Sequence, residues 1–84
     1  MKGGGVDYLM CAEQAVVKIT WTDAPAAVGA PVRVQTSAHG HSEPAVFVGD
    51  AIHWEARQRR VAPGQSVVLY DPDDDRVLGG GLAA

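Results

Sequence analysis

Cysteine, basic residues and long apolar runs are all scarce in this sequence of 84 residues. The single cysteine, Cys11, excludes a disulfide or a cysteine-based zinc site within one chain and fits a reducing compartment. Nowhere do about 18 apolar residues follow one another, as a membrane-spanning helix would require, and the amino end lacks the apolar region of a signal peptide. We therefore expect a cytoplasmic protein with no membrane contact.

The shortage of positive charge limits nucleic-acid binding. Seven Lys and Arg against ten Asp and Glu give a formal net charge of −3. Strong sequence-independent binding depends on many Lys and Arg side chains that displace counterions from phosphates. Any contact with RNA should therefore be local and weak.

What the sequence does have is the composition of one small folded domain. It is 46% hydrophobic and 20% charged, far from the signature of disorder. A chain of this length has room for a single core, and so small a core leaves little net stability. A stabilising partner or an oligomer would fit this size.

The first half of the chain contains two segments typical of strands. Residues 1–14 show no period, and we expect a flexible lead or a remnant segment there. From Ala15 on, AVVKITW is rich in β-branched and aromatic residues, which predicts a strand with Val17, Ile19 and Trp21 on one face. After a loop rich in Ala, Pro and Gly, PVRVQTSAH alternates cleanly. Its predicted apolar face holds Val32, Val34, Thr36 and Ala38, and its polar face holds Arg33, Gln35, Ser37 and His39.

The second half adds four shorter candidates. AVFV and AIHWEARQ, joined by Gly49–Asp50, predict a hairpin. In its second strand we expect Ile52, Trp54 and Ala56 to alternate with His53, Glu55 and Arg57. Pro63 and Gly64 fit a type II turn, because that turn needs positive φ at its second central residue. SVVLY and RVLGGGLA, separated by the polar loop DPDDD, are the last two predicted strands.

Short strands at regular spacing, with no helix-period segment, favour an all-β fold. We predict a single domain over residues 15–84, a small antiparallel six-stranded β-barrel whose closure removes exposed edges. Trp21 and Trp54 fall on apolar faces. Packing in the core or against another domain is therefore a stronger interpretation for both than stacking on a base.

The run VAPGQSVVLYDPDDDRVLGGGL, from Val61 to Leu82, resembles the end of bacterial tRNA-specific 2-thiouridylases. In that family a PGQ turn, an apolar strand closing in Tyr, an acidic loop and an LGGG-type strand occur in the same order. VQTSAHG (34–40) and KITWTDAP (18–25) resemble upstream family segments. The resemblance covers residues 15–84 and implies the C-terminal β-barrel of the enzyme, with its catalytic machinery elsewhere.

The resemblance also implies an activity, the ATP-dependent transfer of sulfur to the wobble uridine of tRNA. The family's ATP would bind a loop of the type SGGVDSS in a large amino-terminal domain, so we expect no cofactor in this chain. Gly4–Asp7 echo the GGVD core of that loop, but the strand before it and the expected serines are missing. The second cysteine of the family's pair is also absent, so Cys11 is interpreted as a plain apolar thiol.

Two further patterns could suggest a metal, and neither has suitable spacing. His39 and His41 are separated by a turn glycine, and His53 lies in another predicted strand. The aspartates of the DPDDD loop lack the Gly and Glu positions of a calcium-binding EF-hand. We expect no metal site, no cofactor site and no catalytic residue in this chain, with solvated histidines as the simpler interpretation.

A local cluster of arginines is the remaining candidate for function. Arg57, Arg59 and Arg60 precede the PGQ turn, and Arg33 and His39 lie on a predicted polar face, so all five offer donors suited to phosphates. Two interpretations stay open for the cluster, contact with a tRNA backbone and an ordinary solvated surface. The acidic loop would repel RNA, so contact should lie away from it.

Three hypotheses follow for the function. The leading one is an accessory tRNA-binding barrel that is joined to or docked on a thiouridylase catalytic domain and positions tRNA while the chemistry occurs elsewhere. The second is a free-standing or remnant barrel that binds another protein chain, has no RNA activity and exposes an apolar patch. The third, that these residues alone are an enzyme, requires ATP at Gly4–Asp7 and sulfur chemistry at Cys11, and we reject it.

Overall fold

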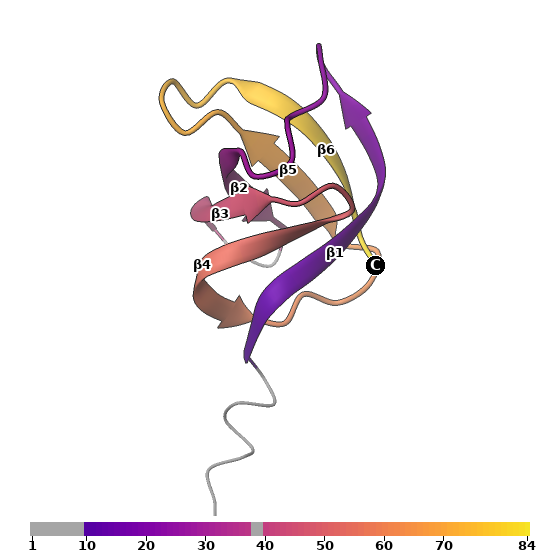
Figure 1. The fold of residues 1–84 in the computed structure, drawn as a ribbon. Helices are drawn as coiled ribbons and strands as arrows, with labels where there is room; N and C mark the ends of the chain where they lie inside the picture. Colours follow the sequence, from indigo (N-terminus) through magenta and orange to yellow (C-terminus); the bar gives the residue numbers. More distant parts are fainter. Residues whose placement is uncertain (1–9, 38–39) are drawn as a thin grey trace, which may run out of the picture.

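The computed structural model describes residues 10–37 and 40–84 and folds them into a closed antiparallel barrel of six strands (Figure 1). The strands are β1 (Met10–Trp21), β2 (Pro31–Thr36), β3 (Glu43–Phe47), β4 (Ala51–Arg59), β5 (Ser66–Tyr70) and β6 (Val77–Ala83). Around the barrel their order is β1-β4-β3-β2-β5-β6, and β6 closes on β1. The predicted all-β, six-stranded antiparallel barrel is therefore confirmed. Within the described ranges we find no helix long and apolar enough for a membrane span.

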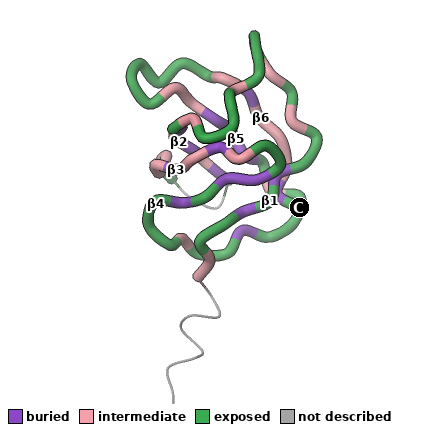
Figure 2. The backbone as a smooth tube through the Cα atoms, in the orientation of Figure 1, coloured by how far each residue is buried: buried purple, intermediate pink, exposed green. Residues whose placement is uncertain are grey.

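Buried residues recur along the strands, and in β2 and β5 they alternate with less buried ones (Figure 2). Val32 and Val34 from β2, Val67 and Leu69 from β5, and Ile52 from β4 are the largest fully buried side chains. Burying a side chain of this kind stabilises the fold by about 1.5–3 kcal/mol. The clean alternation predicted for β2 is present from Val32 to Thr36.

β1 begins earlier than the sequence pattern indicates. We predicted a strand from Ala15, whereas the strand starts at Met10, opposite Arg59 of β4. The pairing is irregular, because Cys11 lies opposite Gln58 while Glu13 already lies opposite His53. This bulge interrupts the two-residue period that would have marked the start of the strand.

A second irregularity reverses the faces within β1. Lys18 has a φ of 56°, and the register with β6 shifts between Val17 and Thr20. Val16 is consequently buried and Val17 is 43% exposed, while Ile19 and Trp21 pack against the core. The prediction that Val17 shares a face with Ile19 and Trp21 is wrong for Val17, because one residue in the left-handed region moves the following side chains to the other face.

The bulge also alters the far half of β4. Ile52 and Trp54 are buried and His53 and Glu55 are exposed, as predicted. Ala56, however, is exposed rather than inward, because the residues after Trp54 are the excess residues of the bulge opposite β1. Arg57 lies in this bulged segment.

The Pro63–Gly64 turn has the geometry that the sequence predicts. Gly64 has a φ of 89°, and the Gln65 N–H donates to the Ala62 carbonyl over 3.3 Å, as in a type II turn. The Gly64 N–H also donates to the Ala83 carbonyl over 2.8 Å. The turn therefore ties the segment that follows β4 to the end of β6.

Candidate nucleic-acid interface

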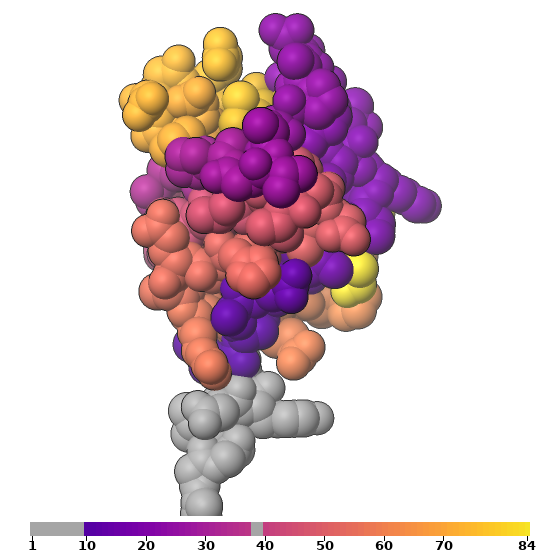
Figure 3. All heavy atoms as spheres, viewed as in Figure 1, coloured from indigo at the N-terminus to yellow at the C-terminus, as the bar shows by residue number. Residues whose placement is uncertain are grey.

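The arginine cluster lies at the end of the barrel where β4 extends beyond the residues that pair with β3. β3 pairs with β4 at Ala45–Phe47, and the last pairs of β4 are made with Met10 and Cys11 of β1. In Figure 3 this end of β4 lies beside the start of β1 at the bottom of the molecule. The arginines are thus carried by a two-stranded ribbon rather than by a sheet that is covered on both sides.

Arg57, Arg59 and Arg60 are all exposed. Arg57 lies in the bulged segment of β4, Arg59 lies opposite Met10 of β1, and Arg60 follows directly after β4. Among residues 10–37 and 40–84, no ion pair engages any of the three guanidinium groups. Each therefore keeps its donors for a ligand from outside the barrel.

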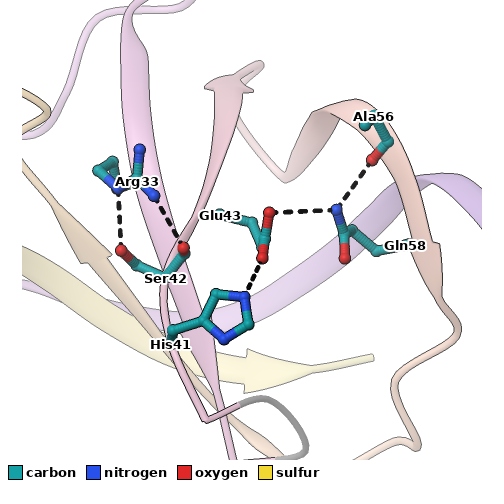
Figure 4. Close-up of polar contacts among 6 residues, drawn as sticks. All are labelled: Arg33, His41, Ser42, Glu43, Ala56 and Gln58. Atoms are coloured by element: carbon teal, nitrogen blue, oxygen red, sulfur yellow. Dashed lines mark hydrogen bonds and ion pairs between the residues drawn. The ribbon is translucent and has the colours of Figure 1, made fainter.

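A hydrogen-bonded link holds this ribbon to β3 (Figure 4). The Gln58 amide nitrogen donates to a Glu43 carboxylate oxygen over 3.5 Å and to the Ala56 carbonyl over 3.1 Å. The other Glu43 oxygen pairs with Nε2 of His41. Gln58 is half-buried, whereas Arg57 and Arg59 on either side of it are exposed. The sequence places Gln58 in the cluster as a further donor, but its hydrogen bond to Glu43 could not be predicted, since only the barrel pairing brings the two residues together.

Arg33 has a different environment from the cluster. Its Nε donates to the Ser42 hydroxyl over 2.9 Å, and one terminal nitrogen donates to the Ser42 carbonyl over 2.8 Å. Figure 4 shows the guanidinium directed at Ser42, across the β2–β3 turn. Arg33 thus fastens that turn, and its contact with tRNA stays a prediction. His39 lies outside the described residues.

The other candidate groups are dispersed. His53 pairs with Glu13 over 3.4 Å on the outside of β4 and β1, away from the link of His41 and Glu43. Over the part of the chain that the structure describes, no three His, Cys, Asp or Glu side chains are placed to hold a metal ion. Cys11 is half-buried and packs against the core. The Gly4–Asp7 segment lies outside the described residues.

The acidic loop, residues 71–76, lies at the opposite end of the barrel from the arginines (Figures 1 and 3). Its carboxylates organise the loop itself: Asp71 accepts from the Asp73 N–H over 2.8 Å, and Asp74 accepts from the Arg76 N–H over 3.0 Å. Arg76 also pairs with Asp71 over 3.6 Å. The four aspartates of this loop therefore lie at the opposite end of the barrel from Arg57, Arg59 and Arg60, while Arg76 lies among the aspartates and the exposed Glu55 comes two residues before Arg57.

The hollows of the surface are small. One of about 260 Å³ is lined by Gln35, Ser42, Tyr70 and Asp75, and one of about 190 Å³ lies between Thr22–Ala24 and the start of β6. Small-molecule sites usually enclose about 300–1,000 Å³. Neither of these two hollows is lined by an arginine of the cluster.

Both tryptophans belong to the core or its border. Trp54 is 5% exposed and inward. Trp21 packs edge-on against Phe47 with ring centroids 5.2 Å apart. These positions favour packing over base stacking, as the alternation predicted.

Comparison with known proteins gives a family-model match and several similar relatives. A family model described as an aminomethyltransferase β-barrel domain matches residues 13–83. The tRNA-specific 2-thiouridylase of Mycobacterium avium is 47% identical over 57 residues, which cover 61% of this chain and 16% of that protein. Its counterpart from Roseiflexus sp. is 42% identical over 69 residues, 76% of this chain and 17% of that protein.

A third relative, the tRNA-specific 2-thiouridylase of Caulobacter vibrioides, is 54% identical over 35 residues, 40% of this chain and 9% of that protein. The chain thus spans less than a fifth of the length of these relatives. No solved structure matches it. The resemblance found in the Val61–Leu82 motifs is confirmed.

Proposed function

The chain belongs to the aminomethyltransferase β-barrel domain family, and from that premise we propose that it is an accessory tRNA-positioning barrel of a tRNA 2-thiouridylase, non-catalytic on its own. Its role is to hold tRNA by the backbone while the rest of such an enzyme, in the cytoplasm, carries out the ATP-dependent sulfur transfer. The tRNA-specific 2-thiouridylases that are similar to this chain are much longer than it is.

The unpaired arginine cluster carries this proposal. Three exposed arginines lie within four residues, at the end of β4 and directly after it, and the acidic loop is at the other end of the barrel. The parallel N–H groups of an arginine side chain can donate two hydrogen bonds to phosphate oxygens. Contacts of this kind fix the position of a nucleic acid without recognising its base sequence. A phosphate strand laid across this end would meet donors and avoid the region of like charge.

A second candidate function is a protein-interaction barrel with no RNA activity. Its supporting observation is the net charge of −3 together with the exposed valines Val17 and Val77, each 43% exposed. Under this alternative the arginines are ordinary solvated side chains. The two functions make opposite predictions for a titration with tRNA.

The test is an NMR titration of the ¹⁵N-labelled chain with tRNA at low salt. We expect amide shifts concentrated at 57–60, and a log–log dependence of affinity on salt with a slope of about −2 to −3, as for three neutralised phosphates. Replacing Arg57, Arg59 and Arg60 together by Gln should abolish most of that slope. Arg76→Gln, which removes an exposed arginine paired with Asp71 at the other end, is the control: it should weaken binding much less than the triple substitution and leave the shifts at 57–60 in place.

If no shifts occur near 57–60 at low salt, or if Arg76→Gln weakens binding as much as the triple substitution, tRNA positioning by this surface is wrong. The protein-interaction alternative would then be the better account. Far-ultraviolet circular dichroism of each variant checks that the barrel stays folded.

A further inference from the structure

Lys18 is the one charged residue of three adjacent strand segments, β5, β6 and the second half of β1. β5 reads SVVLY and β6 reads VLGGGLA, so neither strand carries a charge. β6 lies between β5 and β1, and from Gln14 to Trp21 the sequence of β1 has no other charged residue than Lys18. Lys18 is exposed, so this sector of the barrel presents one positive charge among neutral side chains.

The bulge in β1 takes Lys18 out of the regular alternation of the strand. Val17 lies opposite Leu82 and Thr20 lies opposite Gly80, so β1 has one more residue than β6 between these two pairs. Lys18 accommodates the extra residue in the left-handed region, with a φ of 56°. Gly is the usual residue in this conformation at a bulge, because a side chain strains the backbone there. Strained residues of this kind cluster at sites of function, and bulges can redirect a side chain next to such sites.

The Lys18 ammonium group has no carboxylate partner in the described portion of the chain. Glu13, five residues earlier on β1, is paired with His53 over 3.4 Å. Asp23 follows β1 and Asp50 precedes β4, both are exposed, and neither forms an ion pair with Lys18. The ammonium group therefore keeps its three donors for a ligand from outside the barrel.

Lys18 is distant from the acidic loop. A methyl group on Gly81 would lie 2.6 Å from the Val17 carbonyl oxygen and 3.2 Å from a side-chain carbon of Ile19, so Gly81 lies beside the bulge. Five residues of extended chain, or about 17 Å, separate Gly81 from Arg76 at the end of the loop. Charges so far apart are largely screened at 0.15 M salt, where the Debye length is about 8 Å. A phosphate bound at Lys18 would therefore meet little repulsion from the loop.

β1 connects Lys18 to the arginine cluster, because it runs along the barrel from the end that carries the arginines (Figure 1). Met10, at the start of β1, lies opposite Arg59. The eight residues from Met10 to Lys18 span at most about 27 Å of extended strand. This distance exceeds the size of one phosphate group, so Lys18 and the cluster would hold phosphates from different parts of an RNA. Two separate backbone contacts fix the orientation of the RNA as well as its position.

We propose that Lys18 is a second tRNA contact, a positioning residue that binds a backbone phosphate apart from those held at 57–60. The inference rests on the proposed function, since it assigns a further contact to the same RNA. The ammonium group acts on a phosphate oxygen as a point charge and recognises no base. An acidic segment of a protein could use the same charge, and the experiments distinguish it from RNA.

The first experiment measures the affinity for tRNA against salt in three variants, Lys18→Gly, Lys18→Gln and Lys18→Arg. One neutralised phosphate adds about 0.7–0.9 to the magnitude of the log–log salt slope. Both neutral variants should lose that amount, and their binding at low salt should weaken about two- to fivefold, as expected for one exposed charge pair. Lys18→Arg should keep both the slope and the affinity. Arg76→Gln removes the same charge elsewhere and should leave the slope nearly unchanged.

Thermal unfolding of the same variants separates the charge from the strain. Lys18→Gly relieves the left-handed conformation and should melt at a higher temperature than the unsubstituted chain. Lys18→Gln keeps the strain and should melt close to the unsubstituted chain. A variant that is more stable and yet binds tRNA more weakly has lost a contact and not its fold.

The second experiment measures the rate at which acetic anhydride acetylates Lys18, with tRNA and with polyglutamate as the added polyanion. At a tRNA concentration about ten times Kd, acetylation should slow roughly tenfold, since only the free chain reacts. Polyglutamate should protect Lys18 much less. Equal protection by polyglutamate would overturn the proposal in favour of an acidic protein ligand. An unprotected Lys18 in the tRNA complex, or an unchanged salt slope in Lys18→Gly, would also overturn it.

The arginine variants separate this proposal from the proposed function. If the triple substitution at 57–60 lowers the salt slope and Lys18→Gly does not, the Lys18 contact is wrong and the arginine surface stands. If Lys18→Gly lowers the slope and the triple substitution does not, the Lys18 contact stands and the arginine surface is wrong.

Discussion

A methyl group on Gly81 would lie 2.6 Å from the carbonyl oxygen of Val17. Gly79 has the same relationship to the Thr20 carbonyl, at 2.7 Å. The two contacts lie on the seam where β6 closes on the irregular part of β1, so the glycines allow the strands to approach closely at the Lys18 bulge. The LGGG motif thus has a structural reason in this chain.

Gly81→Ala should destabilise the barrel. The atom in the way is a backbone oxygen that cannot rotate aside, and overpacking of this kind costs about 1–3 kcal/mol or more. Gly40→Ala is the matched control, because a methyl group there meets no atom of the described residues within 4 Å. Urea unfolding should show a lower midpoint for the first variant and an unchanged or slightly higher one for the second. Equal midpoints would mean that the seam does not need glycine.

Thr36→Val should stabilise the fold. The Thr36 hydroxyl is buried at 2% residue exposure, and no described residue accepts or donates a hydrogen bond to it. Burying an unsatisfied hydroxyl costs about 1–3 kcal/mol, and valine has nearly the same shape. We expect a gain of about 1 kcal/mol in thermal unfolding. Thr22→Val should instead lose stability, because that hydroxyl is hydrogen-bonded to the carbonyls of Val77 and Leu78.

Arg33→Ala should lower stability while leaving affinity for tRNA nearly unchanged. Its two hydrogen bonds to Ser42 are charge-assisted, and each such bond contributes about 1.5–3 kcal/mol at most. Ser42→Ala removes one acceptor and should cost less. If Arg33→Ala instead weakens tRNA binding as much as loss of an arginine at 57–60, the assignment of Arg33 to the turn is wrong.

Neutralising the acidic loop should strengthen binding of tRNA at low salt. Asp73→Asn with Asp75→Asn removes two negative charges and leaves the loop hydrogen bonds of Asp71 and Asp74 in place. Asn also tolerates the φ of 59° at position 75. The gain acts through space, so it should fade near 0.15 M salt, where charges more than about 8 Å apart are screened. A gain that persists at high salt would instead indicate direct contact.

The sequence predicted the barrel because the alternation in β2, the short apolar run of β5 and the Pro63–Gly64 turn are local signals. It could not predict the faces of β1 and the far half of β4. In these segments the face on which a side chain lies depends on the strand that pairs with it. The bulges at Lys18 and after Trp54 cannot be recognised from the sequence of either strand alone. The candidate site likewise has a part that the sequence shows and a part that depends on strand pairing. Arg57, Arg59 and Arg60 are visible as a run of charge, whereas the link from Gln58 to Glu43 joins residues brought together only by strand pairing.

The pairing of β1 with β6 also has a consequence for the order of folding. Val16 pairs with Ala83, so the first strand of the barrel finds one of its two neighbours only when the last strand has been synthesised. Contacts so distant in sequence close late and slow folding. Until then one side of β1 is an unpaired edge, open to pairing with other chains. We therefore expect a nascent or truncated chain that lacks β6 to aggregate readily.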